Sequence, residues 1–122
     1  MTDRRIVLPI RGDIYLVNFD PTIGSEINKT RPAPIIQNNI ANENSPITIV
    51  AAITSKFDDR LYPTEVQLYP PEGGLKTNSV VLLNQIRSID RQRLIKKIGA
   101  ISVDKLHEVD RAIQISFGLL YL

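Results

Sequence analysis

Residues 46–55 read PITIVAAITS, a stretch that is almost continuously apolar and rich in β-branched side chains. Such a run is typical of a β-strand that is buried on both of its faces. It is far shorter than the ~20 apolar residues that a membrane-spanning helix requires. We therefore predict a central strand of a β-sheet over residues 46–55.

Shorter β-forming segments lie on both sides of this run. Residues 12–19 (GDIYLVNF) alternate in the manner of a first strand. Residues 31–39 (RPAPIIQNN) contain Pro32 and Pro34, which lack a backbone donor and restrict the segment to an edge strand or a strand beginning. Further strands are predicted at 64–69 and at 79–84, the latter continuing through 85–89 past a bend. Residues 41–45 are predicted to be a polar connection, 57–63 a loop and 70–74 a turn.

Two helices are predicted toward the C-terminus. Asp90 is expected to cap a short helix over residues 90–99 that Gly99 closes. Ser102 is the expected N-cap of a longer helix, with Asp104 in its first turn. Apolar side chains then recur at helical spacing: Leu106, Val109, Ile113, Phe117 and Leu120. About five short strands and a terminal helix that packs on the sheet predict a small, mostly β barrel with a C-terminal α-helix.

The composition narrows the class of protein. The chain has 122 residues, of which 43% are hydrophobic, and this size fits one domain with its own core. We predict a single domain over 11–122 after an N-terminal tail over 1–10 that could be disordered. There is no cysteine, which excludes disulfides, thiolate metal sites and a cysteine nucleophile and favours a reducing cytoplasm. We expect no membrane segment, and the pI of about 9.0 is compatible with a polyanionic partner.

The loop at residues 24–32 (GSEINKTRP) is the most promising place for chemistry. It brings an acid, two cations and two hydroxyls between two predicted strands. Cleaving RNA without a metal requires a proton acceptor, a proton donor and cations for the developing phosphorane charge. Glu26, Arg31 and a nearby hydroxyl could supply these functions, although the residues alone also fit an ordinary solvated loop. The single histidine, His107, is predicted to be a surface or packing residue.

Four blocks of sequence form a specific pattern when they are read in order. They are RGDIYLVNFDPTIGSE (11–26), KTRPAPIIQNN (29–39), NSPITIVAAITS (44–55) and GLKTNSVVLLNQIRSIDRQRLIKKIG (74–99). This pattern resembles MazF/PemK-type toxins of bacterial type II toxin–antitoxin systems, over nearly the whole chain. The resemblance implies an SH3-like barrel of the MazF/CcdB toxin type, with a C-terminal helix.

The same resemblance implies an activity and its partners. We expect a homodimer that cleaves single-stranded RNA (mRNA) at short motifs and leaves 2′,3′-cyclic phosphate and 5′-hydroxyl ends. No metal or other cofactor is expected. Growth inhibition would last until a cognate antitoxin binds, and this MazE-like protein is expected to be acidic and partly disordered.

The resemblance also assigns roles to individual residues. Arg31 and Thr54 match the family's catalytic Arg and Thr, and Glu26, beside Ser25, matches an acid that is assigned a role in some members. A guanidinium is suited to binding the scissile phosphate and stabilising the transition state. The residues predicted to contact RNA are Ser25, Asn28, Lys29, Phe57 and Arg87.

Two other functions remain open from the sequence. A CcdB-like toxin would share the fold but bind gyrase and cleave nothing, and an inactive homologue would act only as a regulator with its antitoxin. Glu65 stands where many relatives carry His, Asn78 where they carry Asp, and Pro34 replaces a β-branched residue. Glu65 is expected to be solvated or to repel RNA, so a different cleavage motif is expected.

Overall fold

The run at 46–55 forms β3 (Ile47–Thr54) in the computed structural model, which describes residues 8–21, 23–24 and 29–121. Residues 50–54 are all buried, so the predicted strand and its burial are confirmed. β3 lies at the end of a three-stranded sheet ordered β3-β5-β4, so the predicted central position is wrong. The edge of β3 that faces away from β5 makes an isolated backbone bridge, between Val50 and Ile35.

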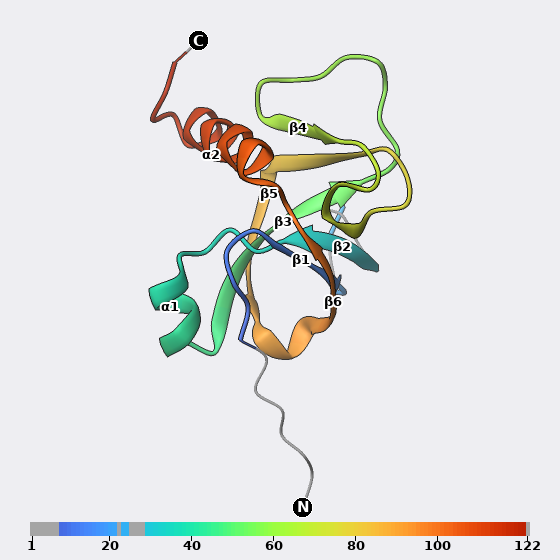
Figure 1. Ribbon diagram of the computed structural model, residues 1–122. Helices are drawn as coiled ribbons and strands as arrows, with labels where there is room; N and C mark the ends of the chain where they lie inside the picture. Colours follow the sequence, from blue (N-terminus) through green and yellow to red (C-terminus); the bar gives the residue numbers. More distant parts are fainter. Residues whose placement is uncertain (1–7, 22, 25–28, 122) are drawn as a thin grey trace, which may run out of the picture.

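The strands form two antiparallel sheets (Figure 1). The first has the order β2-β1-β6 and contains β1 (Asp13–Asn18), β2 (Thr30–Pro34) and β6 (Leu94–Ala100). The second joins β3 to β4 (Glu65–Leu68) and to the long β5 (Ser79–Asp90). β2 is an edge strand, as its prolines predict. The mostly β fold with a C-terminal helix is confirmed, while the hydrogen-bonded ladder of the described strands does not close into a barrel.

The bend predicted after residue 84 is a shift of register in β5. Ala51 pairs with Ile86 whereas the next residue, Ala52, pairs with Leu82. The three residues 83–85 therefore bulge out of the ladder, which bends β5 and increases its twist. This bend lets one strand pair with β4 through its first part and with β3 along its length.

Two apolar cores pack against opposite faces of the second sheet. One core lies between that sheet and the C-terminal helix and includes Ile53, Val81 and Val109. The other lies between the two sheets and includes Val17 and Val50. Successive residues of a strand point to opposite faces, so a single strand such as β3 supplies side chains to both cores.

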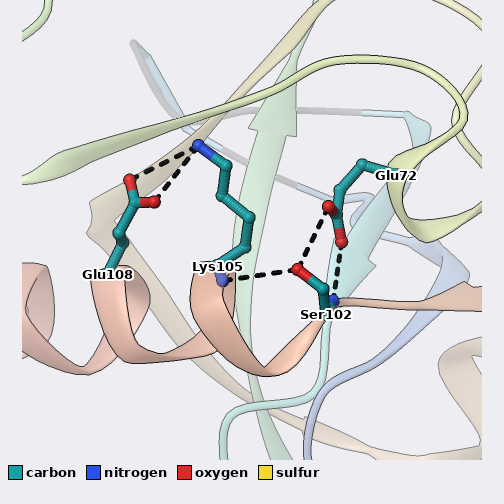
Figure 2. Close-up of polar contacts among 4 residues, drawn as sticks. All are labelled: Glu72, Ser102, Lys105 and Glu108. Carbon is teal, nitrogen blue, oxygen red and sulfur yellow. Dashed lines mark hydrogen bonds and ion pairs between the residues drawn. The ribbon is translucent and has the colours of Figure 1, made fainter.

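The C-terminal helix α2 (Val103–Ser116) begins as predicted (Figure 2). The hydroxyl of Ser102 accepts from the backbone N–H of Lys105, which caps the helix. The carboxylate of Glu72, in the short 3-10 helix η1 (Glu72–Gly74), accepts from the Ser102 backbone N–H at 2.6 Å and from its hydroxyl at 3.2 Å. Lys105 also pairs with Glu108 at 3.2 Å. Glu72 thus supplies a second cap, which sequence spacing did not indicate because it comes from 30 residues away.

The helix predicted over residues 90–99 is wrong. The Asp90 side chain does accept from the backbone N–H of Gln92, but it caps only the 3-10 turn η2 (Arg91–Arg93). Residues from Leu94 onward extend and pair with β1, whose edge needs a hydrogen-bonded partner. Tertiary pairing therefore overrides a helical pattern here.

The polar connection predicted at residues 41–45 is also wrong, because α1 (Asn39–Asn44) occupies it. Asn38 caps this helix by accepting from the Ala41 backbone N–H at 2.8 Å. Asn42 is completely buried, and its side-chain oxygen accepts from the Thr48 hydroxyl at 2.8 Å and from the Gln37 amide at 2.9 Å. A polar segment becomes helical because its asparagines cap and anchor it.

The beginning of the chain is described only from residue 8. Pro9 is buried, while most of the predicted N-terminal tail lies outside the described residues. Within the described ranges, no helix has both the length and the apolar character that a bilayer crossing requires.

The contact between η1 and β6 gives a first testable prediction. A Cβ added at Gly99 would lie 2.3 Å from the backbone oxygen of Gly73, so Gly99→Ala forces one of the two backbones to move. We expect a loss of about 1–3 kcal/mol in the free energy of unfolding, measured in urea. Lys96→Ala is the control, because it changes an exposed residue of the same strand and adds no atom between β6 and η1. Equal free energies of unfolding for Gly99→Ala and wild type would contradict this prediction, because they would show that the two backbones can move apart without cost.

Tyr15 gives a prediction for alkaline pH. Burial raises the pKa of Tyr15 above its ordinary value of 10.0, and the Asp13 carboxylate adds to this while Lys97 opposes it. The unfolded chain therefore loses the phenol proton at lower pH than the folded chain does, and stability falls as pH rises above about 10. We expect this fall to be smaller in Tyr15→Phe, measured by urea unfolding between about pH 9 and pH 11. Identical curves for both proteins would contradict the assignment to Tyr15.

Candidate active site

An isolated bridge joins Ile35, just after β2, to Val50 on β3, and its register indicates that Arg31 and Thr54 lie toward the same end of these strands. Continuing the antiparallel register of the Ile35–Val50 bridge by four residues along each strand leads to Arg31 on β2 and Thr54 on β3. Strand alternation puts Arg31 on the same face of β2 as Ile35, and Thr54 on the same face of β3 as Val50. Ile35 and Val50 belong to the core between the sheets. By this alternation, Arg31 at the start of β2 and Thr54 at the end of β3 are on the strand faces that turn toward the core between the sheets.

Thr54 is held in a fixed orientation. Its side chain is buried, and its hydroxyl accepts from the Lys56 backbone N–H at 3.1 Å and donates to the Lys56 backbone oxygen at 3.2 Å. A hydroxyl has a single proton to donate, so donating to a bound anion requires it to turn away from Lys56. The hydrogen bond that the hydroxyl gives up, to the Lys56 oxygen, is a long one. Only the hydroxyl proton reorients, while the strand that carries Thr54 stays fixed.

A pocket of about 240 Å³ opens beside Thr54. Its walls come from the end of β3, the loop at 55–64, the start of β4 and the facing part of β5. The lining residues are Thr54, Lys56, Phe57, Asp58, Arg60, Tyr62, Glu65 and Leu82. Thr54 and Phe57, both predicted from the sequence to belong to the site, thus share one cavity.

Two aromatic rings and a cation form the outer part of this pocket. Phe57 is 41% exposed and Tyr62 is 47% exposed, so both rings keep surface available to a bound molecule. The Arg60 guanidinium carbon lies 5.8 Å from the centroid of the Tyr62 ring, and the Arg60 backbone N–H donates to Asp58 at 2.9 Å. Exposed aromatic faces next to guanidinium groups are the surfaces on which the bases of single-stranded nucleic acids stack.

Hydrogen bonds hold the two ends of the loop between β1 and β2. The Phe19 backbone N–H donates to the Lys29 oxygen at 3.0 Å, and the Lys29 N–H donates to the Asp20 carboxylate at 2.8 Å. Lys29 adopts a φ of +64°, a left-handed conformation that lets the chain turn into β2. Three of the predicted site residues, Ser25, Glu26 and Asn28, lie outside the described residues.

Arg87 from β5 and Arg93 from η2 hold the chain where it leaves β1 and enters this loop. The Arg87 guanidinium donates to the Phe19 backbone oxygen at 2.7 Å and lies over the Phe19 ring, 5.7 Å from its centroid. Arg93 donates to the backbone oxygen of Asn18 at 3.0 Å and to that of Asp20. Arg87 does not line the pocket, so in the structure its observed contacts position the loop.

Several residues of the pocket were not predicted from the sequence. Residues 56–65 (KFDDRLYPTE) carry five charged and two aromatic side chains directly after Thr54, and this density was the available signal. Glu65, expected to be solvated, is half-buried in the pocket wall. His107 is exposed on α2, as predicted. Within the described part of the chain, no group of three or more His, Asp or Glu side chains is placed to hold a metal ion.

Comparisons with known proteins found a matching family, a similar sequence and similar structures. The family described as PemK-like, MazF-like toxin of type II toxin–antitoxin systems matches residues 10–117. The chain is 44% identical over 110 residues to endoribonuclease EndoA of Bacillus subtilis (strain 168), with 90% of this chain and 95% of the relative covered. MazF of Deinococcus radiodurans is 28% identical with a TM-score of 0.79, over 93% of this chain and 99% of that one. A MazE–MazF structure from the same organism has 28% identity and a TM-score of 0.75, over 94% and 100%.

The fastening of the loop gives a prediction. Asp20→Ala removes the acceptor of the Lys29 N–H, whereas Asp20→Asn keeps an acceptor oxygen in the same place. Losing a hydrogen bond to a charged group costs about 1.5 kcal/mol. This loss raises the fraction of molecules in which the loop is locally open roughly tenfold. We expect trypsin to cut after Lys29 about tenfold faster in Asp20→Ala, measured by mass spectrometry of the fragments. Equal cleavage of the alanine and asparagine variants would show that this bond does not hold the loop.

Proposed function

The chain belongs to the PemK-like, MazF-like toxin family of type II toxin–antitoxin systems, and from this premise we propose that it is an endoribonuclease that cuts single-stranded RNA. The observation that supports the proposal is the pocket lined by Thr54 and by the exposed rings of Phe57 and Tyr62. Arg31 does not line this pocket, and the register of the Ile35–Val50 bridge supports its position near the same strand end. The name of the 44% identical relative, an endoribonuclease, supports the same activity. The substrate is mRNA, and its cleavage stops growth.

The proposed reaction uses the RNA's own 2′-hydroxyl. Its oxygen attacks the adjacent phosphorus, the bond from phosphorus to the 5′-oxygen breaks, and the products are a 2′,3′-cyclic phosphate and a 5′-hydroxyl. A base takes the 2′-hydroxyl proton and an acid gives a proton to the leaving 5′-oxygen. Glu26 is the proposed proton-transfer group, because a carboxylate can both accept and return a proton.

Arg31 and Thr54 stabilise the charge that develops on the phosphate. A guanidinium donates two parallel hydrogen bonds to phosphate oxygens and stays charged throughout the reaction. Thr54 adds a neutral donor from a buried strand end, once its hydroxyl proton has turned from the Lys56 oxygen to the phosphate. Because Arg31 and Thr54 are carried by different sheets, their proposed cooperation depends on the bridge that joins these sheets at Ile35 and Val50.

The remaining predicted residues are assigned to binding. Ser25, Asn28 and Lys29 are assigned to contacts with the RNA backbone. Phe57 presents an exposed ring for a base, and Arg87 supports the loop through Phe19 while adding positive charge.

Partners and location follow from the family. We propose that the chain acts as a homodimer in the cytoplasm, as a single domain over 11–122, and that RNA lies in a groove along the dimer. A MazE-like antitoxin, acidic and partly disordered, blocks that groove because its carboxylates occupy the positions where RNA phosphates would bind. A relative solved as a MazE–MazF pair supports this partner.

One experiment tests the activity. Purified protein is incubated with a long single-stranded RNA in excess EDTA, and the cut sites and end groups are mapped. We expect discrete cuts with 5′-hydroxyl ends, and a loss of about 10²-fold or more in rate for Arg31→Ala and for Thr54→Val. Thr54→Ser, which keeps the hydroxyl, should retain most of the activity.

The control is Arg111→Ala, which removes the same charge from an exposed position on α2. It should cut at the wild-type rate. Cleavage that persists in Arg31→Ala would refute the assigned site, and cleavage that requires an added divalent metal would refute the mechanism. No cleavage by folded wild type would favour a toxin that binds a protein target.

A further inference from the structure

Glu65 is an unexpected residue in a pocket proposed to receive RNA. A carboxylate repels phosphate, yet this side chain is half-buried in the wall of the cavity that Thr54 also lines. Its position is fixed by the ladder, since Glu65 on β4 pairs with Leu82 on β5, and Leu82 pairs with Ala52 on β3. Cross-strand partners share a face, so Glu65 and Thr54 lie on the same side of this sheet.

Backbone contacts hold the Glu65 carboxylate in place. One carboxylate oxygen accepts from the Tyr62 backbone N–H at 3.1 Å, and the Glu65 backbone N–H donates to the Tyr62 oxygen at 2.9 Å. This pair of bonds closes a four-residue turn and orients the carboxylate relative to the Tyr62 ring. A carboxylate has about four acceptor positions, so the bond from Tyr62 leaves acceptor capacity for a ligand.

The surroundings of Glu65 match a nucleobase. The exposed rings of Phe57 and Tyr62 offer stacking faces, and Lys56 and Arg60 supply positive charge for the phosphates on either side. Stacking alone is tolerant of sequence, because every base has a flat face. A fixed acceptor beside the stack adds discrimination, because it requires a donor on the edge of the base.

We propose that Glu65 is a specificity-determining residue that accepts a hydrogen bond from the exocyclic amine of one base next to the cut. It therefore favours cytosine, adenine or guanine over uracil, whose edge presents oxygens on both sides of its single N–H. This inference rests on the proposed function, since it concerns the RNA that the same site cleaves. Glu65 acts on base choice and takes no part in the bond-breaking step.

The test compares base preference in matched variants. Wild type, Glu65→Gln and Glu43→Gln cleave a single-stranded RNA of randomised sequence in EDTA, and sequencing of the ends gives the base frequencies around the cut. Glutamine keeps an oxygen for the Tyr62 N–H while offering an N–H₂ donor to the base. Glu43, exposed on α1 and outside the pocket, controls for the same change of charge.

We expect uracil to be depleted about tenfold or more at one position beside the wild-type cut. Glu65→Gln should remove or invert that preference at this position alone, and Glu43→Gln should match wild type. Tyr62→Leu, which keeps the backbone N–H that Glu65 needs, should slow cleavage about tenfold while leaving the preference unchanged. Thermal unfolding of each variant checks that the fold is intact.

Two results would overturn the proposal. One is an identical preference at every position for wild type and folded Glu65→Gln, and the other is a wild-type preference for uracil at all positions near the cut. If wild type cuts no RNA, the proposed nuclease function fails by itself. The base preference is then measured by binding of oligocytidine, oligoadenosine and oligouridine, and equal affinity for all three would overturn the role of Glu65.

Discussion

The backbone bridge between Ile35 and Val50 is the constraint on which the candidate site depends. It joins the sheet containing β2 to the sheet containing β3, and the Ile36 backbone N–H continues the contact by donating to the Ile49 oxygen at 2.9 Å. Because it fixes the register between the sheets, it determines which residues meet at their open end. A shift by one residue on either strand would turn Arg31 or Thr54 to the opposite face. The position of this bridge therefore matters for the proposed site as well as for packing.

The bridge is rigid because the residues that form it are buried. Ile35 and Val50 are both 0% exposed, and the Ile35 N–H and oxygen also bond to the backbone at Asp13 and Gly12. The loops that carry the rest of the site are then fastened to this frame by a few charged groups, such as Arg87 at the Phe19 oxygen. Hydrogen bonds of this kind contribute about 1.5–3 kcal/mol each, enough to hold the two ends of a loop against the sheet. This division of roles is common in enzymes, where a rigid scaffold positions functional loops.

The sequence predicted the elements whose signal is local. The β-branched run of β3, the proline-rich edge strand β2 and the capped helix α2 all follow from patterns within a few residues. β6 was predicted as a helix because Asp90 and Gly99 resemble helix ends, yet Gly99 is needed for its close approach to the Gly73 backbone. Among the site residues, Thr54 was assigned by the family resemblance, because the residues alone indicated only an ordinary strand residue. The partners of Glu65 could not, because its position in the pocket depends on a pairing with Leu82 that no local pattern encodes.

A carboxylate within an RNA pocket lowers affinity in order to raise discrimination. Glu65 repels the phosphates of every bound RNA equally, whereas its hydrogen bond is made only with a base that offers a donor. Specificity is the difference between these binding free energies, so a group that weakens all complexes can still widen the gap between them. Lys56 and Arg60 line the same pocket and offset the repulsion without reading the base edge. A toxin that destroys RNA gains from this arrangement, because a site with cations alone would bind any single strand and leave the choice of cut to chance.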